Sequence, residues 1–388
     1  MPETEVAEIE ATGVPDLLHM AMELSTREWR VRFCTNGGKA REASVTAGDV
    51  DGLMAHVEKA KGKLGLSPDC AVVSCYEAGR DGFWIHHALT ARGIFNQVVD
   101  SASVPVERRG RHAKTDRLDV KSLCTLLVRA TAGEDGVWRI VRVPGKEVED
   151  ERRVQRELDR LIQERTAHRA RLRSLLALEG IRVGKLRDLR SELPDLTRWD
   201  GEPLGEHLRA ELERECRRLE GVEEMIKEVE AERDSLLAEA KSQAANTAAK
   251  LTTLKGVGKT TATALAYESL GWRVFSNRKD AGASTGLVGT PYSSGKMKRE
   301  QGISKAGSAR VRRVMVEFAW GWLRHQPGSA LTRWWYDKFG LGSGRQKRVG
   351  IAALARRLFI ALWRYVKFGV VPEGALVRLQ TKKKAKTG

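Results

Sequence analysis

The 388-residue sequence predicts an α/β region at the N-terminus followed by all-α regions. Three observations predict this fold class. Strand-like and helix-like segments alternate in the first third of the chain, which is the order typical of an α/β domain. Two long stretches rich in arginine and glutamate follow, with apolar residues at steps of three and four, as in long packed helices. Two shorter helix-like segments then begin the C-terminal region.

The N-terminal region contains a recognisable series of strands and helices. A turn at Asn36-Gly37-Gly38 separates two of the first strands, and the stretch DCAVVSCYEAG is typical of a buried strand that runs into a loop. The predicted elements are three strands within 17–46, a helix over 47–64, a strand within 69–79, a helix near 82–92, a strand over 94–99 and a helix over 115–129. We therefore expect an α/β domain over residues 17–140, preceded by an acidic tail over 1–16.

Two long helices are predicted over residues 146–181 and 204–240. Their apolar side chains form one face of each helix. Polar residues interrupt this seam at Arg165, His168, Glu215 and Arg233. An antiparallel or dimeric coiled coil explains the pattern, and a packed helical pair inside one domain explains it equally well. We assign residues 146–245 to these paired helices and expect them to serve oligomerisation.

The region from residue 247 to 372 is predicted to form a C-terminal domain, followed by a basic tail over 373–388. Its segment GVGKT is similar to a phosphate-binding loop, but that motif requires glycine where Thr253 stands, and no strand precedes it. Two helices joined by a Gly256-Val257-Gly258 hairpin are the better interpretation, because exposed amides in such a turn can bind a phosphate.

The positive charge is concentrated at the C-terminus. The chain has 68 Lys and Arg against 51 Asp and Glu, a net charge of +17, yet residues 291–388 contain 22 basic and four acidic residues. Basic side chains neutralise phosphates, so the charge favours a nucleic-acid partner over a membrane surface. Aromatic residues alternate with the charge, and although aromatic rings can stack on bases, we favour a core role for them. They are Trp320, Trp322, Trp334, Trp335, Tyr336, Phe339, Trp363 and Tyr365.

Several classes of protein are excluded by composition. The five cysteines are scattered and form no CxxC pair, which argues against a disulfide scaffold or a zinc finger. No apolar run is long enough to span a bilayer, and the acidic N-terminus lacks the apolar segment of a signal peptide. We therefore expect a cytoplasmic protein with no membrane partner.

Four carboxylates are candidates for a metal site: Glu23, Glu77, Asp116 and Asp119. Glu23 lies in an apolar strand, where an acid is costly unless it is paired or bound to metal. Glu77 follows a buried strand, and Asp116 and Asp119 share one face of a predicted helix. Carboxylates suit Mg²⁺, and two such ions can promote phosphoryl transfer. Spacing alone equally allows Asp116 to cap the helix and Asp119 to pair with Arg117 or Lys121.

The segments MELSTREWRVRF, YEAG and HAKTDRLDVKSL resemble successive motifs of the insertion-sequence transposases of family one-ten. The resemblance implies an N-terminal RuvC-like, RNase H-type domain with an Asp-Glu-Asp-Asp tetrad, which falls on Glu23, Glu77, Asp116 and Asp119. It implies two Mg²⁺ ions, for which Mn²⁺ can substitute. Glu23 departs from the pattern because it replaces an aspartate, and its extra methylene changes the spacing to the metal.

The segment GASTGLVGTPYSSGKMKREQGISKAG is similar to the second conserved domain of the same family. The resemblance implies that the serine before Gly295, Ser294, attacks a DNA phosphodiester, with Ser293 as the alternative. Without the resemblance, a polar turn is the favoured interpretation of both serines. The residues expected to bind phosphates are Lys296, Lys298, Arg299, Lys305, Arg310, Arg312 and Arg313.

The resemblance further implies donor and target DNA as partners, a structured guide (bridge) RNA, and a homo-oligomer, either dimer or tetramer. In such an assembly the carboxylates of one protomer would act with Ser294 of another. We expect a prokaryotic, nucleoid-associated DNA transposase. A RuvC-type metal-dependent nuclease that uses water and a non-catalytic nucleic-acid-binding protein are the alternatives, and the second is kept open by Glu23.

Overall fold

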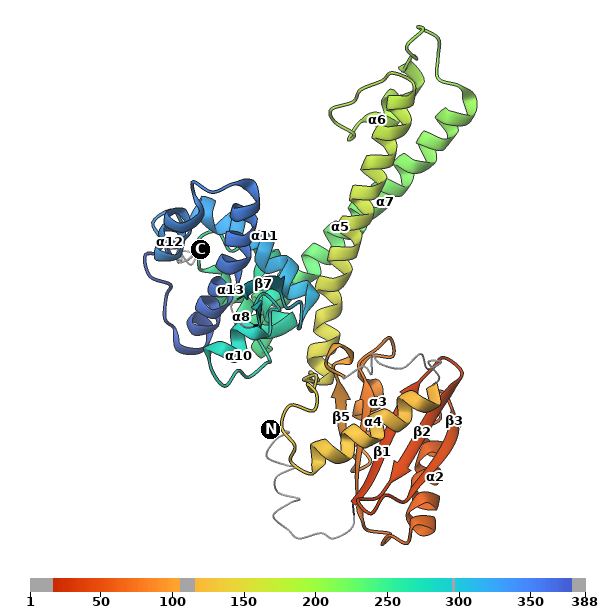
Figure 1. Ribbon diagram of the computed structural model, residues 1–388. Coiled ribbons are helices and arrows are strands. Elements are labelled where there is room, and N and C mark those ends of the chain that lie inside the picture. Colours follow the sequence, from red (N-terminus) through yellow and green to blue (C-terminus); the bar gives the residue numbers. More distant parts are fainter. Residues whose placement is uncertain (1–16, 105–115, 295–296, 379–388) are drawn as a thin grey trace, which may run out of the picture. The chain divides into compact units, whose positions relative to one another are not determined.

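The computed structural model describes residues 17–104, 116–294 and 297–378 (Figure 1). The chain divides into two compact units, Met1–Val143 and Pro144–Gly388. The predicted acidic tail lies outside the described residues, as does the basic tail from residue 379 onward.

The first unit is built on a five-stranded mixed sheet with the order β3-β2-β1-β4-β5. Its strands are β1 (Leu17–Leu24), β2 (Glu28–Cys34), β3 (Ala40–Thr46), β4 (Ala71–Glu77) and β5 (Phe95–Val99). Strands β1, β2 and β3 pair antiparallel, whereas β4 is parallel to both β1 and β5. Every strand expected from the sequence is present.

Helices cover both faces of this sheet. Helices α2 (Val50–Leu64) and α3 (Trp84–Thr90) pack on one face, where the buried side chains include Met20, Met22, Val31, Phe33 and Tyr76. Helix α4 (Asp116–Thr131) packs on the other face, against Ala21, Cys34, Val73 and Cys75. Alternate residues of each strand therefore contribute to different clusters, as the period of two requires. The mixed α/β architecture of the N-terminal region is confirmed.

The second unit begins with two long helices, α5 (Lys146–Leu178) and α7 (Glu206–Glu239), which lie side by side in Figure 1. They are connected through α6 (Leu189–Glu192) and a short 3-10 turn at Leu193–Asp195. Late α5 packs on early α7, and early α5 packs on late α7, so the pair is antiparallel. The apolar seams of α5 and α7 are thus satisfied in part within one chain, which was one of the two arrangements left open by the pattern.

Two of the polar residues that interrupt the seam, His168 and Glu215, are paired across the two helices. The side chain of Glu215 is only 1% exposed and contacts His168 Nδ1 at 2.7 Å, together with Arg171 and Arg218. Burial alone would raise the pKa of Glu215, but hydrogen bonds from His168, Arg218 and Arg171 outweigh burial, and the pKa is lowered. The buried charge of Glu215 is therefore compensated by its neighbours.

A helical core forms the rest of the second unit. Its helices are α8 (Gln243–Thr252), α9 (Lys259–Leu265), α10 (Arg278–Ala283), α11 (Ala309–His325), α12 (Ala330–Phe339) and α13 (Gly344–Phe368). A π-helical turn at Ala266–Leu270 follows α9, and strands β6 (Gly289–Ser294) and β7 (Met297–Ile303) form a separate two-stranded ribbon. Helix α8, not a strand, precedes the GVGKT segment, so the exclusion of a phosphate-binding loop agrees with the fold.

The aromatic residues of the basic region divide between core and surface. Trp322, Trp335 and Trp363 are buried in the core cluster, which confirms the core interpretation for them. Trp320 and Tyr336 are exposed, so the core interpretation is wrong for these two. Within the described ranges, no helix is long and apolar enough to cross a membrane.

Candidate functional site

Glu23 and Glu77 lie at the same edge of the sheet, which is the one where the parallel strands β1 and β4 end. Strands β1 and β4 are parallel neighbours, and Met22 pairs with Tyr76 in their register. Glu23 and Glu77 are the next residue on each strand. Because Met22 and Tyr76 face α2 and α3, strand alternation directs the two glutamates to the opposite face, which α4 covers.

Helix α4 brings its first turns to this edge. Near its C-terminal end, Thr131 Oγ1 lies 2.7 Å from Nε2 of His19, early in β1. Val120, near its N-terminal end, borders a small hollow with Arg30, and Arg30 is the β2 partner of Glu23. The helix therefore runs antiparallel to β1 and starts at the level of Glu23. Asp119, half-buried beside Val120, lies at this level.

The four predicted carboxylates thus come from three elements that meet at one sheet edge. The backbone of Asp116 begins α4, but its side chain lies outside the described residues. Among side chains that are described, no group of three or more His, Cys, Asp or Glu residues is close enough to hold a metal ion. The available donors are hard carboxylate oxygens, which is the ligand type that Mg²⁺ prefers.

Ser294 lies at the end of the β6–β7 ribbon. Its backbone pairs with Met297, and Ser293 pairs with Lys298. The two residues between the strands, Gly295 and Lys296, are outside the described residues, as are the side chains of residues 291–301. The backbone therefore places Ser294 at the last pair before the connection, next to the tip of the ribbon.

The base of the ribbon is tightly constrained. Gly286 and Gly307 have φ values of 66° and 108°, and a Cβ on either would lie 2.5 Å or less from a backbone oxygen. Lys305, one of the residues expected to bind phosphate, has a φ of 56° and is exposed. Arg312 Nη1 donates to the Lys305 carbonyl at 3.0 Å. Arg312, also expected to bind phosphate, is thus a structural brace for the segment that follows β7.

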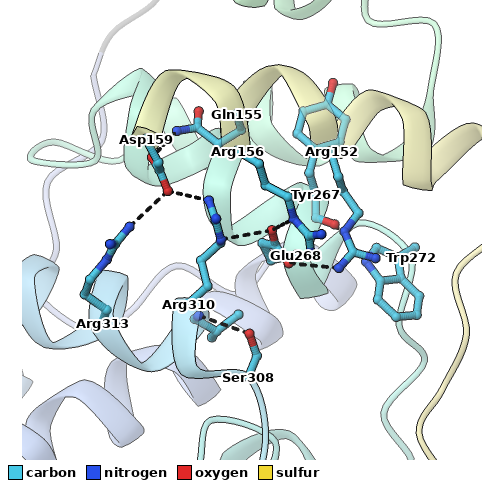
Figure 2. A network of polar contacts seen from close by, with 11 residues as sticks. Arg152, Gln155, Arg156, Asp159, Tyr267, Glu268, Trp272, Ser308, Arg310 and Arg313 are labelled. Carbon is cyan, nitrogen blue, oxygen red and sulfur yellow. Dashed lines mark hydrogen bonds and ion pairs between the residues drawn. The ribbon is translucent and has the colours of Figure 1, made fainter. Parts of the chain in front are cut away.

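A network of charges connects α5 to the π-helical turn and to α11 (Figure 2). The carboxylate of Glu268 accepts hydrogen bonds from Arg152 at 3.0 Å and from Arg156 at 2.8 and 3.0 Å, and Arg310 Nε lies 3.4 Å away. Asp159 on α5 accepts hydrogen bonds from Arg310 and Arg313. Two of the predicted phosphate-binding arginines are therefore engaged by acids of their own chain.

Glu268 is a buried charge whose neighbours compensate it. Burial alone would raise its pKa, but Arg156, Arg152 and Arg310 together outweigh burial and lower the pKa. Neither Glu268 nor Asp159 was predicted from the sequence. The available signal was the acid inside the apolar segment ALAYESL, because a buried carboxylate requires a partner.

The remaining predicted phosphate-binding residues are described only in part. Lys298 and Arg299 belong to β7, and their side chains lie outside the described residues, while Lys296 lies outside them entirely. Their expected contacts with phosphate stay predictions.

Comparison with known proteins identifies the family to which the chain is similar. The family described as Transposase IS116/IS110/IS902 matches residues 248–333, a segment from α8 to α12 that includes the β6–β7 ribbon. The protein y4rJ of Sinorhizobium fredii (strain NBRC 101917 / NGR234), named provisionally as a transposase, is 41% identical over 377 residues, which are 93% of this chain and 94% of that protein.

Two further relatives match over shorter stretches. The protein y4qE of the same organism, also named provisionally as a transposase, is 30% identical over 251 residues, 64% of this chain and 58% of that protein. The transposase for insertion sequence element IS1328 of Yersinia enterocolitica is 33% identical over 151 residues, 38% of this chain and 42% of that protein. The resemblance found in the sequence motifs is confirmed, and the chain belongs to the IS116/IS110/IS902 family of insertion-sequence transposases.

Proposed function

We propose that this transposase cuts and rejoins DNA through its serine, Ser294, with divalent metal ions bound by Glu23, Glu77, Asp116 and Asp119. The observation that carries the proposal is the meeting of β1, β4 and α4 at one edge, which brings the segments bearing these carboxylates together. The sheet order, with three antiparallel strands followed by two parallel ones, supports a RuvC-like, RNase H-type fold for this unit.

The chemistry balances as a transesterification. The Ser294 hydroxyl oxygen forms a bond to phosphorus, the bond from phosphorus to one sugar oxygen breaks, and the released sugar oxygen takes up a proton as the hydroxyl loses one. When bound, Mg²⁺ or Mn²⁺ would stabilise the attacking and leaving oxygens. The phosphodiester energy is conserved in the serine ester, so attack by a recipient hydroxyl rejoins DNA and releases Ser294.

Nucleic-acid binding is proposed for the basic second unit. The 22 basic residues over 291–388 suit phosphates, and affinity for DNA would fall steeply with salt because bound counterions are released. A structured guide RNA is proposed as a second nucleic-acid partner, and the charge is compatible with it. Assembly through α5 and α7 would join the carboxylates of one protomer to Ser294 of another.

Trapping on labelled element-end DNA in Mg²⁺ tests the serine. Covalent protein–DNA adducts are expected with the wild type and with Ser293→Ala, and none with Ser294→Ala. Strand cleavage retained by Ser294→Ala would instead support the water-using nuclease. Tight DNA binding by the wild type without cleavage in Mg²⁺ or Mn²⁺ would support a non-catalytic binding protein.

A further inference from the structure

Two aromatic rings are exposed on neighbouring helices of the second unit. Trp320 of α11 is 47% exposed and Tyr336 of α12 is 54% exposed. Large aromatic residues usually bury most of their surface, so two exposed rings in one neighbourhood indicate a surface that contacts something else.

A buried tryptophan, Trp335, contacts both of these rings. Trp335, which is 3% exposed, has its ring centroid 6.1 Å from that of Trp320 and 5.2 Å from that of Tyr336, with interplanar angles of 68° and 86°. Helix α13 packs closely against Trp335 at Gly350, where a Cβ would lie only 2.8 Å from the Nε1 atom of Trp335. The exposed rings are therefore held in place by the core, so their side chains lose less conformational entropy when a ligand binds.

The surroundings of these rings are basic. Arg324 follows Trp320 by one helical turn and Arg333 precedes Tyr336 by three residues, so each arginine shares a helix face with a ring, and both are exposed. Over residues 309–368 there are 13 basic residues against two acidic ones, Glu317 and Asp337. A polyanion is thus the partner whose charge complements this surface.

We propose that Trp320 and Tyr336 form a stacking site for unpaired bases of a nucleic-acid strand, with Arg324 and Arg333 beside its phosphates. Exposed ring faces combined with cations are the features that bind single strands, because every base has a face that can stack. In a duplex those faces are covered by neighbouring base pairs, and protein contacts go mainly to phosphates. The inference rests on the proposed function only in requiring a nucleic-acid substrate.

The test is binding of the full chain to a labelled oligothymidylate and to a duplex of equal length, measured by fluorescence anisotropy. The double variant Trp320→Ala, Tyr336→Ala is expected to bind oligothymidylate at least about 30-fold more weakly, because two stacked bases lose their aromatic partners. Duplex affinity should change by less than about twofold, because phosphate contacts remain.

Two controls separate stacking from other effects. Tyr336→Phe keeps the ring and should retain wild-type affinity. Leu341→Ala removes an even more exposed apolar side chain without a ring and should leave the affinity unchanged. Thermal unfolding of each variant verifies that the fold is retained.

Unchanged oligothymidylate affinity in the double variant would overturn the stacking site and leave the proposed function standing. Equal losses for oligothymidylate and duplex would overturn it also, as would a change in oligomeric mass with unchanged affinity, which would identify a protein contact. A wild type that binds neither probe would overturn both proposals.

Discussion

The charge network around Glu268 offers a quantitative test of how the second unit is held together. Glu268→Gln keeps the size of the side chain but removes its charge, leaving Arg152 without its buried partner. The side chains of Glu268 and Arg152 are 4% and 10% exposed. Breaking such a pair from one side costs about 3–5 kcal/mol because the remaining charge stays buried.

The structure places the expected cost at the lower end of this range. Arg156 is 46% exposed and can be solvated by water, and Arg310 keeps its ion pair with Asp159. We therefore expect a loss of about 3 kcal/mol in the free energy of unfolding of the second unit. For a unit of this size that corresponds to a melting temperature lower by roughly 6–12 °C.

Urea is the suitable denaturant, because guanidinium is a salt that would screen the ion pairs. The unfolding transition is followed by circular dichroism for the wild type, Glu268→Gln and the matched control Glu317→Gln, whose carboxylate is exposed on α11. The control should change stability by no more than about 0.5 kcal/mol. If Glu268→Gln is as stable as the control, the reasoning about the buried charge is refuted.

Three further predictions follow from the same structure. The pKa values of Glu268 and Glu215 lie below the ordinary 4.5, so the stability that these carboxylates add to the fold is complete above that pH and is lost as the pH falls through the lowered values. Acid titration of the wild type should show this loss of stability, and Glu268→Gln should show less of it. Asp119→Asn, like addition of chelator, should abolish adduct formation on element-end DNA but spare duplex binding; full adduct yield in either case would contradict a metal site at the sheet edge. Arg312→Ala should lower the yield of the Ser294 adduct, because the Lys305 carbonyl loses its hydrogen-bond donor, and Arg312→Lys should restore part of the yield. Equal adduct yields for the wild type and both variants, measured by gel analysis, would contradict the bracing role of Arg312.

Most secondary structure as far as α9 could be predicted from the sequence, because local periodicity is sufficient for it; the β6–β7 ribbon and helices α10 to α13 were not predicted. Helix α5 begins at Lys146 as expected and ends at Leu178, three residues before the predicted end. The exposure of Trp320 could also have been predicted: Met315, Phe318, Ala319 and Trp322 are buried at helical spacing, and a residue two positions from Trp322 lies on another face of the helix.

The candidate site was accessible to sequence reasoning only in part. Motif resemblance singled out Glu23, Glu77, Asp116, Asp119 and Ser294, but their roles stay predictions. The pairing of Met22 with Tyr76 gives the first two a common edge, and no local pattern contains that register. The hydrogen bond from Arg312 to the Lys305 carbonyl could not be predicted for a similar reason, since an arginine bound to a carbonyl and an arginine available for phosphate have the same spacing in a helix.

The sequence by itself determined the order of strands and helices as far as α9, the family and the polarity of charge along the chain, because these depend on residue type and short-range spacing. Only the tertiary structure decided which charges are compensated and which rings remain on the surface. Glu268 meets Arg152 and Arg156 across separations of 116 and 112 residues. Such contacts arise from the packing of whole helices, and their energy depends on burial, which is a property of the folded chain and not of any segment.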